Sequence, residues 1–146
     1  MLRNNDFLSL NIFNLTFFLI FQKDLLNSPS YSIETDESTD ISVTKLLSFT
    51  VRYYSPRFLE VRETFLDLID IEKADAESLF QHLKNVIDDW GLDPLKFIGL
   101  GTDGASVMIG VKQSLWVLAK RFYPNLKPIR CAPHSIDLCA RGNLNF

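Results

Sequence analysis

The sequence predicts an α/β fold in which a mixed five-stranded sheet has helices on its faces. Three consecutive segments between residues 31 and 71 are typical of strands, and in the second of them polar and apolar residues alternate with a period of two. Between residues 76 and 90 the apolar residues recur every three or four positions, as on one face of a helix. Two short apolar segments and two more helical patterns follow. A chain of 146 residues, 47% of them apolar, suits one domain of this kind.

The first three segments are predicted strands joined by short turns. Tyr31–Thr35 contains β-prone residues and is followed by the polar residues 36–40, which favour a turn. Apolar and polar residues alternate from Leu47 to Tyr54, and Ser55-Pro56 marks the next turn. The third segment extends from about Leu59 to Ile71. Three strands in succession predict an antiparallel meander.

The clearest helix is predicted for Ala76–Trp90. Asp75 is a suitable N-cap, Gly91 can adopt the left-handed conformation that follows many helices, and Pro94 prevents continuation. Four further elements are predicted in the order strand, helix, strand, helix, at Lys96–Thr102, Lys112–Tyr123, Lys127–Cys131 and His134–Arg141.

The resulting order, β-β-β-α-β-α-β-α, is that of the ribonuclease-H-like fold, in which the fourth strand lies beside the first. Asp36, at the end of the first strand, and Asp103, at the end of the fourth, would then be neighbours. Adjacent carboxylates repel unless they share a proton or a cation, and oxygen ligands suit Mg²⁺ or Mn²⁺. A pair of such ions can activate water in phosphodiester cleavage. The alternative is that both Asp residues only form turns.

The N-terminus raises a separate question. Residues 1–27 are predicted to form an apolar segment, helical or poorly packed, before a partial core at residues 28–146. The run Phe7–Phe21 follows a basic residue, as in a signal peptide, but Asn11 and Asn14 interrupt it and no small-residue cleavage pattern follows. A membrane span needs about 20 residues, which is more than this run contains. We expect loose packing here, so that deletion of the first 20 residues leaves unfolding of the rest nearly unchanged.

The charge and the cysteine content argue against a strongly basic nucleic-acid-binding domain and against a small disulfide-rich secreted domain. The chain has 15 Lys and Arg against 18 Asp and Glu, a net charge of -3, so it lacks a strongly basic nucleic-acid footprint. Two Cys cannot form the dense disulfide framework of a small secreted domain. Trp90 and Trp116 could stack on bases, but both lie on apolar faces of predicted helices, which favours core packing.

Four sequence motifs occur in a fixed order along the chain. They are Asp36-Glu37-Ser38-Thr39-Asp40-Ile41-Ser42, Val51-Arg52-Tyr53, Gly99-Leu100-Gly101-Thr102-Asp103-Gly104-Ala105-Ser106-Val107-Met108 and Cys131-x-x-His134-Ser135-x-x-Leu138-Cys139-Ala140. Together, over roughly residues 22–142, the chain resembles hAT-superfamily transposase-like proteins, including relatives with BED-type and MYM-type zinc fingers. Glu34 and Thr35 stand where that family usually has apolar residues.

The resemblance implies a ribonuclease-H-like DNA transposase core with a triad of two Asp and one Glu. It places the two Asp at Asp36 and Asp103, as catalytic residues and ligands of Mg²⁺ or Mn²⁺, and the family's C-x-x-H element at Cys131 and His134. The family's Glu follows a large helical insertion, so we expect the chain to end before it, with an incomplete metal site and no activity alone. Full-length relatives would act on DNA in the nucleus, with oligomerisation through the C-terminal region and no membrane. The alternative is a decayed or domesticated copy that serves as a protein-interaction or DNA-associated scaffold.

Cys131 and His134 also suggest half of a zinc site. A structural zinc needs four ligands, and the remaining His and Cys residues are His82 and Cys139. His82 is expected to pack beside the inward face of its helix, and Cys139 is expected to face the core. The sequence therefore does not predict zinc.

Overall fold

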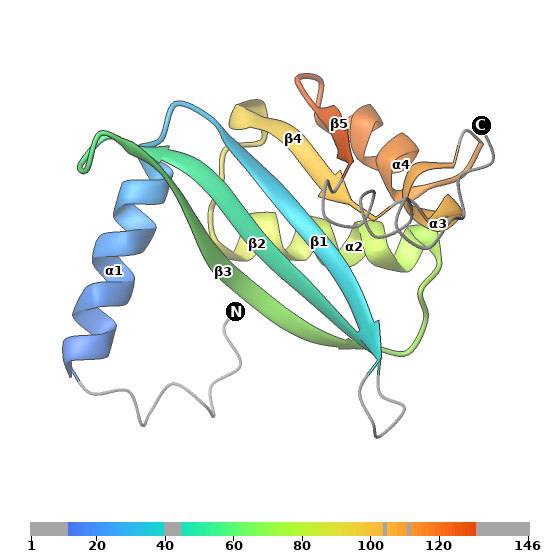
Figure 1. Cartoon of the computed structure of the whole chain (residues 1–146), viewed down its shortest axis with the longest axis horizontal. Coiled ribbons are helices and arrows are strands. Elements are labelled where there is room, and N and C mark those ends of the chain that lie inside the picture. Colours follow the sequence, from blue (N-terminus) through green and yellow to red (C-terminus); the bar gives the residue numbers. More distant parts are fainter. Residues whose placement is uncertain (1–11, 40–44, 104, 111, 131–146) are drawn as a thin grey trace, which may run out of the picture.

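The computed structural model describes residues 12–39, 45–103, 105–110 and 112–130. Five strands form one sheet in the order β3-β2-β1-β4-β5 (Figure 1). β1, β2 and β3 pair in antiparallel fashion, whereas β4 and β5 run parallel to β1. In chain order the elements are α1 (Ile12–Leu26), β1 (Tyr31–Thr39), β2 (Lys45–Ser55), β3 (Glu60–Ile71), α2 (Ala76–Asp89), a 3-10 turn η2 (Pro94–Lys96), β4 (Phe97–Thr102), α3 (Ser106–Ile109), α4 (Leu115–Phe122) and β5 (Lys127–Arg130).

This arrangement confirms the predicted α/β fold with ribonuclease-H-like strand order. The fourth strand lies beside the first, and right-handed crossovers through helices explain why β4 and β5 are parallel to β1. The helix expected at His134–Arg141 lies outside the described residues.

The helix α2 has the caps that its sequence predicts. The carboxylate Oδ1 of Asp75 accepts a hydrogen bond from the backbone N–H of Ser78 at 2.9 Å. Gly91 follows the helix with φ at 67°, a conformation that strains any other L-residue. The side chains on the apolar face of α2 are all buried, and they are Leu79, Phe80, Leu83, Val86 and Ile87.

The core lies between α2 and one face of the sheet, here called the core face. Side chains of β2 alternate strictly, with every second residue from Leu47 to Ser55 buried. The core-facing residues of β1 are Tyr31, Ile33 and Thr35. α1, α2 and α4 lie on this side of the sheet, and no described helix covers the opposite, outer face (Figure 1).

α1 packs more closely than the sequence suggested. The ring of Phe18 lies 5.1 Å from that of Trp90, and the ring of Phe21 lies 6.0 Å from that of Tyr53. Asp24 is buried, and its Oδ2 accepts a hydrogen bond from the Tyr53 hydroxyl at 3.1 Å. The expected loose packing of the first 20 residues therefore does not hold for Phe18, because the aromatic contact joins it to α2.

β1 is longer than the sequence predicted. The polar residues after Thr35 suggested a turn, yet the strand continues to Thr39 and pairs with β2 as far as Lys45. Glu37 and Lys45 form an ion pair at 3.4 Å across the two strands. Asp36 therefore lies within the strand and not at its end, because pairing with β2 outweighs the turn preference of these residues.

Candidate functional site

The register of β1 and β4 places Asp36 and Asp103 side by side. The two strands pair in parallel, and the last paired residues are Glu34 and Gly101. Asp36 is two residues after Glu34 in β1, and Asp103 is two residues after Gly101, directly after the end of β4. Neighbouring strands are about 4.8 Å apart, so if this register continues by two residues the carboxyl groups of Asp36 and Asp103 could share one cation.

Both Asp residues belong to the outer face of the sheet. Asp36 follows the buried Thr35 in β1, so it points to the opposite side, and it is exposed. Thr102 is buried in the same way, and Asp103 after it is half-buried. The sheet therefore offers two carboxylates at one solvent-accessible position.

Local hydrogen bonds fix the position of Asp103. Its Oδ1 accepts a hydrogen bond from the backbone N–H of Ala105 at 3.1 Å, at the start of α3. The hydroxyl of Thr102 donates to the backbone carbonyl of Asp103 at 3.0 Å. A carboxylate has two oxygens, so this cap leaves Oδ2 with lone pairs for a cation.

Two glycines in β4 allow neighbouring side chains to lie over the strand beside this site. A Cβ at Gly99 would lie only 2.6 Å from Cδ1 of Ile129, and one at Gly101 would lie 3.4 Å from Cβ and Cγ of Glu34. Gly101 thus makes room for Glu34, a further carboxylate on the face that carries Asp36. From the sequence, Glu34 is noted only because it stands where the family usually has an apolar residue. Its position beside Gly101 depends on the pairing of β1 with β4, which no local sequence pattern contains.

The acidic residues present fit a divalent cation only in part. Carboxylate oxygens are the donors that Mg²⁺ and Mn²⁺ prefer, and Asp36 and Asp103 supply two of them. Within the described ranges, no three acidic, His or Cys side chains are grouped so that they could hold a metal ion.

The other residues singled out from the sequence fall into two groups, those that the structure describes and those that it does not. Cys131, His134 and Cys139 lie outside the described residues, and His82 is half-buried on α2. The Trp90 ring contacts Phe18 and Phe21, as expected for core packing. None of the helices in the described part of the chain is long and apolar enough to cross a membrane.

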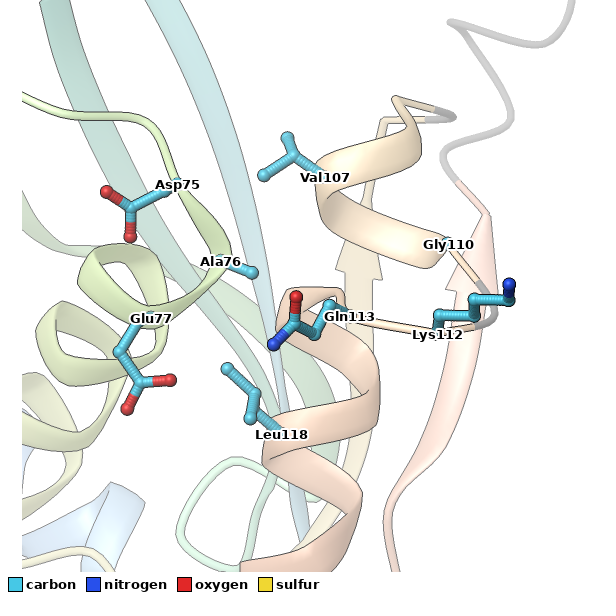
Figure 2. A pocket seen from close by; sticks show the side chains of 8 residues that line it. All are labelled: Asp75, Ala76, Glu77, Val107, Gly110, Lys112, Gln113 and Leu118. Atoms are coloured by element: carbon cyan, nitrogen blue, oxygen red, sulfur yellow. The ribbon is translucent and has the colours of Figure 1, made fainter.

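A pocket of about 630 Å³ opens on the helix side of the sheet, between the start of α2 and the α3–α4 segment (Figure 2). Asp75 and Glu77 lie on one wall and Lys112 on the other, with the side chain of Leu118 between them (Figure 2). The N–H of Ser78 holds the pKa of Asp75 below its usual value, so this carboxylate is an ionised helix cap. The pocket is therefore distinct from the paired Asp residues.

The strand order is that of an RNase-like domain, and the family comparison agrees. Residues 12–113, more than half of the chain, match the sequence model of the family described as DUF4371, the ZMYM1/FAM200 RNase-like domain. The chain belongs to this family. It is thus a transposase-derived, RNase-like domain.

Among solved structures, the chain is similar to an endonuclease V of Ciona intestinalis, determined in complex with a 24mer DNA that contains an inosine followed by a ribo-adenosine. The two chains are 10% identical, the TM-score is 0.33, and the match covers 91% of this chain and 68% of the other. A TM-score this low does not establish a common fold. The fold assignment therefore depends on the strand order and on the family.

Proposed function

We propose that this chain supplies part of the catalytic core of a hAT-type DNA transposase, with Asp36 and Asp103 as ligands of a divalent cation. The observation that supports the proposal is the parallel register of β1 and β4, which would bring Asp36 and Asp103 side by side if it continues two residues beyond Glu34 and Gly101. The order of the four sequence motifs supports the hAT type, and the family match supports the coarser RNase-like assignment. This proposal implies that the substrate is DNA and that the protein acts in the nucleus.

The two Asp residues would have different parts in such a site. Asp103 is held by the N–H of Ala105, so its carboxylate has a fixed position before a cation arrives. Asp36 is exposed on the outer face, where a phosphate group could approach. Mg²⁺ or Mn²⁺ at this position supplies Lewis acidity and a more acidic water.

Binding of Mn²⁺ to the 146-residue protein, followed by electron paramagnetic resonance, tests the proposed ligands. Asp36→Asn and Asp103→Asn should each weaken binding by about tenfold or more, because each removes one of two charged ligands. Glu60→Gln is the matched control, since Glu60 is an exposed carboxylate at the other end of the sheet, and it should leave binding unchanged. Equal binding by all four proteins would exclude the proposed metal site.

A nuclease assay tests whether these ligands suffice for chemistry. Two-metal phosphoryl transfer needs ions held in fixed geometry, and two carboxylates hold a cation loosely. We expect no cleavage of labelled duplex DNA by the 146-residue protein with Mn²⁺. Cleavage that disappears in both Asp→Asn variants would contradict this expectation, whereas cleavage that persists in both indicates a contaminating nuclease.

A non-catalytic scaffold is the second candidate function, and the bond between Asp103 and Ala105 favours it. If Asp103 serves only to form the turn before α3, Asp103→Asn should leave any Mn²⁺ binding unchanged, and the turn should persist because Asn makes the same side-chain bond to the backbone. The Mn²⁺ titration described above separates the two candidates.

A further inference from the structure

Four large apolar side chains are exposed together on the outer face of the sheet. We call them the β2–β3 stripe, and they are Tyr54, Val61, Phe65 and Leu68, with exposed fractions of 40%, 66%, 56% and 51%. Tyr54 lies directly opposite Val61, while Phe65 and Leu68 lie opposite the outward-facing Thr50 and Ser48. Residues opposite one another in a pair of strands share a face, so the four side chains line one continuous track. Clustered apolar exposure of this kind marks interaction sites on soluble domains.

A β-bulge in β3 produces much of this exposure. Asp67 lies opposite the core-facing Phe49, so in a regular strand Phe65 would also face the core. The register shifts at this point instead: Leu66 is buried, and Phe65 lies opposite Thr50 on the outer face. The residues before Phe65 in the strand follow the same shift. A bulge disrupts the strand ladder and re-aims side chains, so a specific distortion turns this stripe outward.

Charges around the stripe are unevenly distributed. Arg52 and Glu63 face each other within it and neutralise one another, with Nε of Arg52 donating to Oε2 of Glu63 at 3.0 Å. Glu34 and Asp36 are exposed on β1, along one side of the stripe, and Asp70 is exposed on β3 beyond Leu68, at one end of the stripe. The stripe is therefore apolar and neutral along its length, and acidic along one side and at one end. Nucleic acid is a poor match, because carboxylates repel phosphates.

The dimensions of the stripe match a helix. Val61 and Leu68 are separated by about 20 Å along the strand, which corresponds to an α-helix of about 14 residues. Two strands span about 10 Å, close to the diameter of a helix with its side chains. A second copy of the sheet would instead bring its own acidic borders close to Glu34 and Asp70.

We propose that the β2–β3 stripe binds an amphipathic helix of a partner protein, with apolar residues along one side and Lys or Arg beside them. The apolar side would cover Val61, Phe65 and Leu68, and the basic residues would meet Glu34 and Asp70. Asp36 lies on the same face, but this proposal needs neither a cation nor Asp103, so peptide binding measured without divalent cations tests it separately from the metal site.

Binding of synthetic 16-residue helical peptides to the full chain tests this proposal. One peptide carries Leu at positions i, i+3, i+4 and i+7 with Lys beside them, and the second carries Glu in place of Lys. Fluorescence anisotropy should show that the Lys peptide binds at least about tenfold more tightly than the Glu peptide. Phe65→Thr, which keeps a strand-forming residue, should weaken binding of the Lys peptide by about tenfold or more. The control Leu95→Thr changes an equally exposed residue on η2 and should have no effect.

Each alternative outcome contradicts the proposal. Equal binding of both peptides, no binding of either, or full binding by Phe65→Thr would exclude a basic helix on this stripe. Self-association of the wild-type chain that Phe65→Thr abolishes, measured by analytical ultracentrifugation, would assign the stripe to a second copy. Circular dichroism should show both variants folded, and Val61→Thr replaces Phe65→Thr if the latter unfolds.

Discussion

Two buried tyrosines allow a matched test of how this domain is held together. Tyr53 and Tyr31 both face the core and are 4% and 2% exposed. The Tyr53 hydroxyl donates to the buried carboxylate of Asp24 at 3.1 Å, and this bond joins β2 to α1. The Tyr31 ring stacks on Phe97 at 5.3 Å, but its hydroxyl has no hydrogen-bond partner within the described residues. Replacement of each by Phe removes only the hydroxyl.

The structure predicts opposite effects of the two changes. A hydrogen bond to a charged group contributes about 1.5–3 kcal/mol, so Tyr53→Phe should lower the free energy of unfolding by about 2 kcal/mol. Tyr31→Phe removes a buried hydroxyl that makes no hydrogen bond within the described residues. The change should therefore leave the free energy of unfolding unchanged or raise it by up to about 1 kcal/mol. Urea denaturation followed by circular dichroism measures both. An equal loss of stability in the two variants would refute the reasoning, because ring packing and not hydrogen bonding would then decide the outcome.

Three further predictions concern pH and glycine positions. Burial, with the Asp24 hydrogen bond, raises the pKa of Tyr53 from 10.0 to about 12, and burial raises that of Tyr123 to about 12. The unfolded chain therefore loses these protons first, so the urea midpoint should be constant from about pH 7 to 9 and should fall between about pH 10 and 12. A flat midpoint up to pH 12 would contradict this. Gly91→Ala should cost about 1 kcal/mol in thermal unfolding, because φ at 67° strains Ala, and an unchanged melting temperature would show that the turn relaxes. Gly99→Ala should destabilise by about 1 kcal/mol, because its Cβ would lie 3.1 Å from Cβ of Ser32, while the end of the exposed Ile129 side chain, 2.6 Å away, can move aside. Gly101→Ala, with its nearest atoms at 3.4 Å, should cost less, and the reverse order would contradict the packing.

Sequence patterns predicted those features that depend on local chemistry. The start of α2 at Ala76 follows from the cap at Asp75, and strand alternation from Leu47 follows from one-sided burial. That the fourth strand lies beside the first could also be predicted, because the order of elements alone implies it.

Features that depend on pairing between distant segments could not be predicted. The turn-forming residues after Thr35 remain in β1 because β2 pairs with them, and no local pattern contains that information. The bulge at Leu66 depends on how β3 aligns with β2. The packing of α1 depends on the contact of Asp24 with Tyr53, which lies 29 residues away.

The most direct test of the central claim is the position of a bound cation. A crystal of the 146-residue protein soaked in MnCl₂ can be measured at the manganese absorption edge. We predict one anomalous peak about 2.1 Å from a carboxylate oxygen of Asp36 and from Oδ2 of Asp103. A peak elsewhere on the domain, or carboxylates that point to opposite faces of the sheet, would contradict the claim that these two residues share a cation.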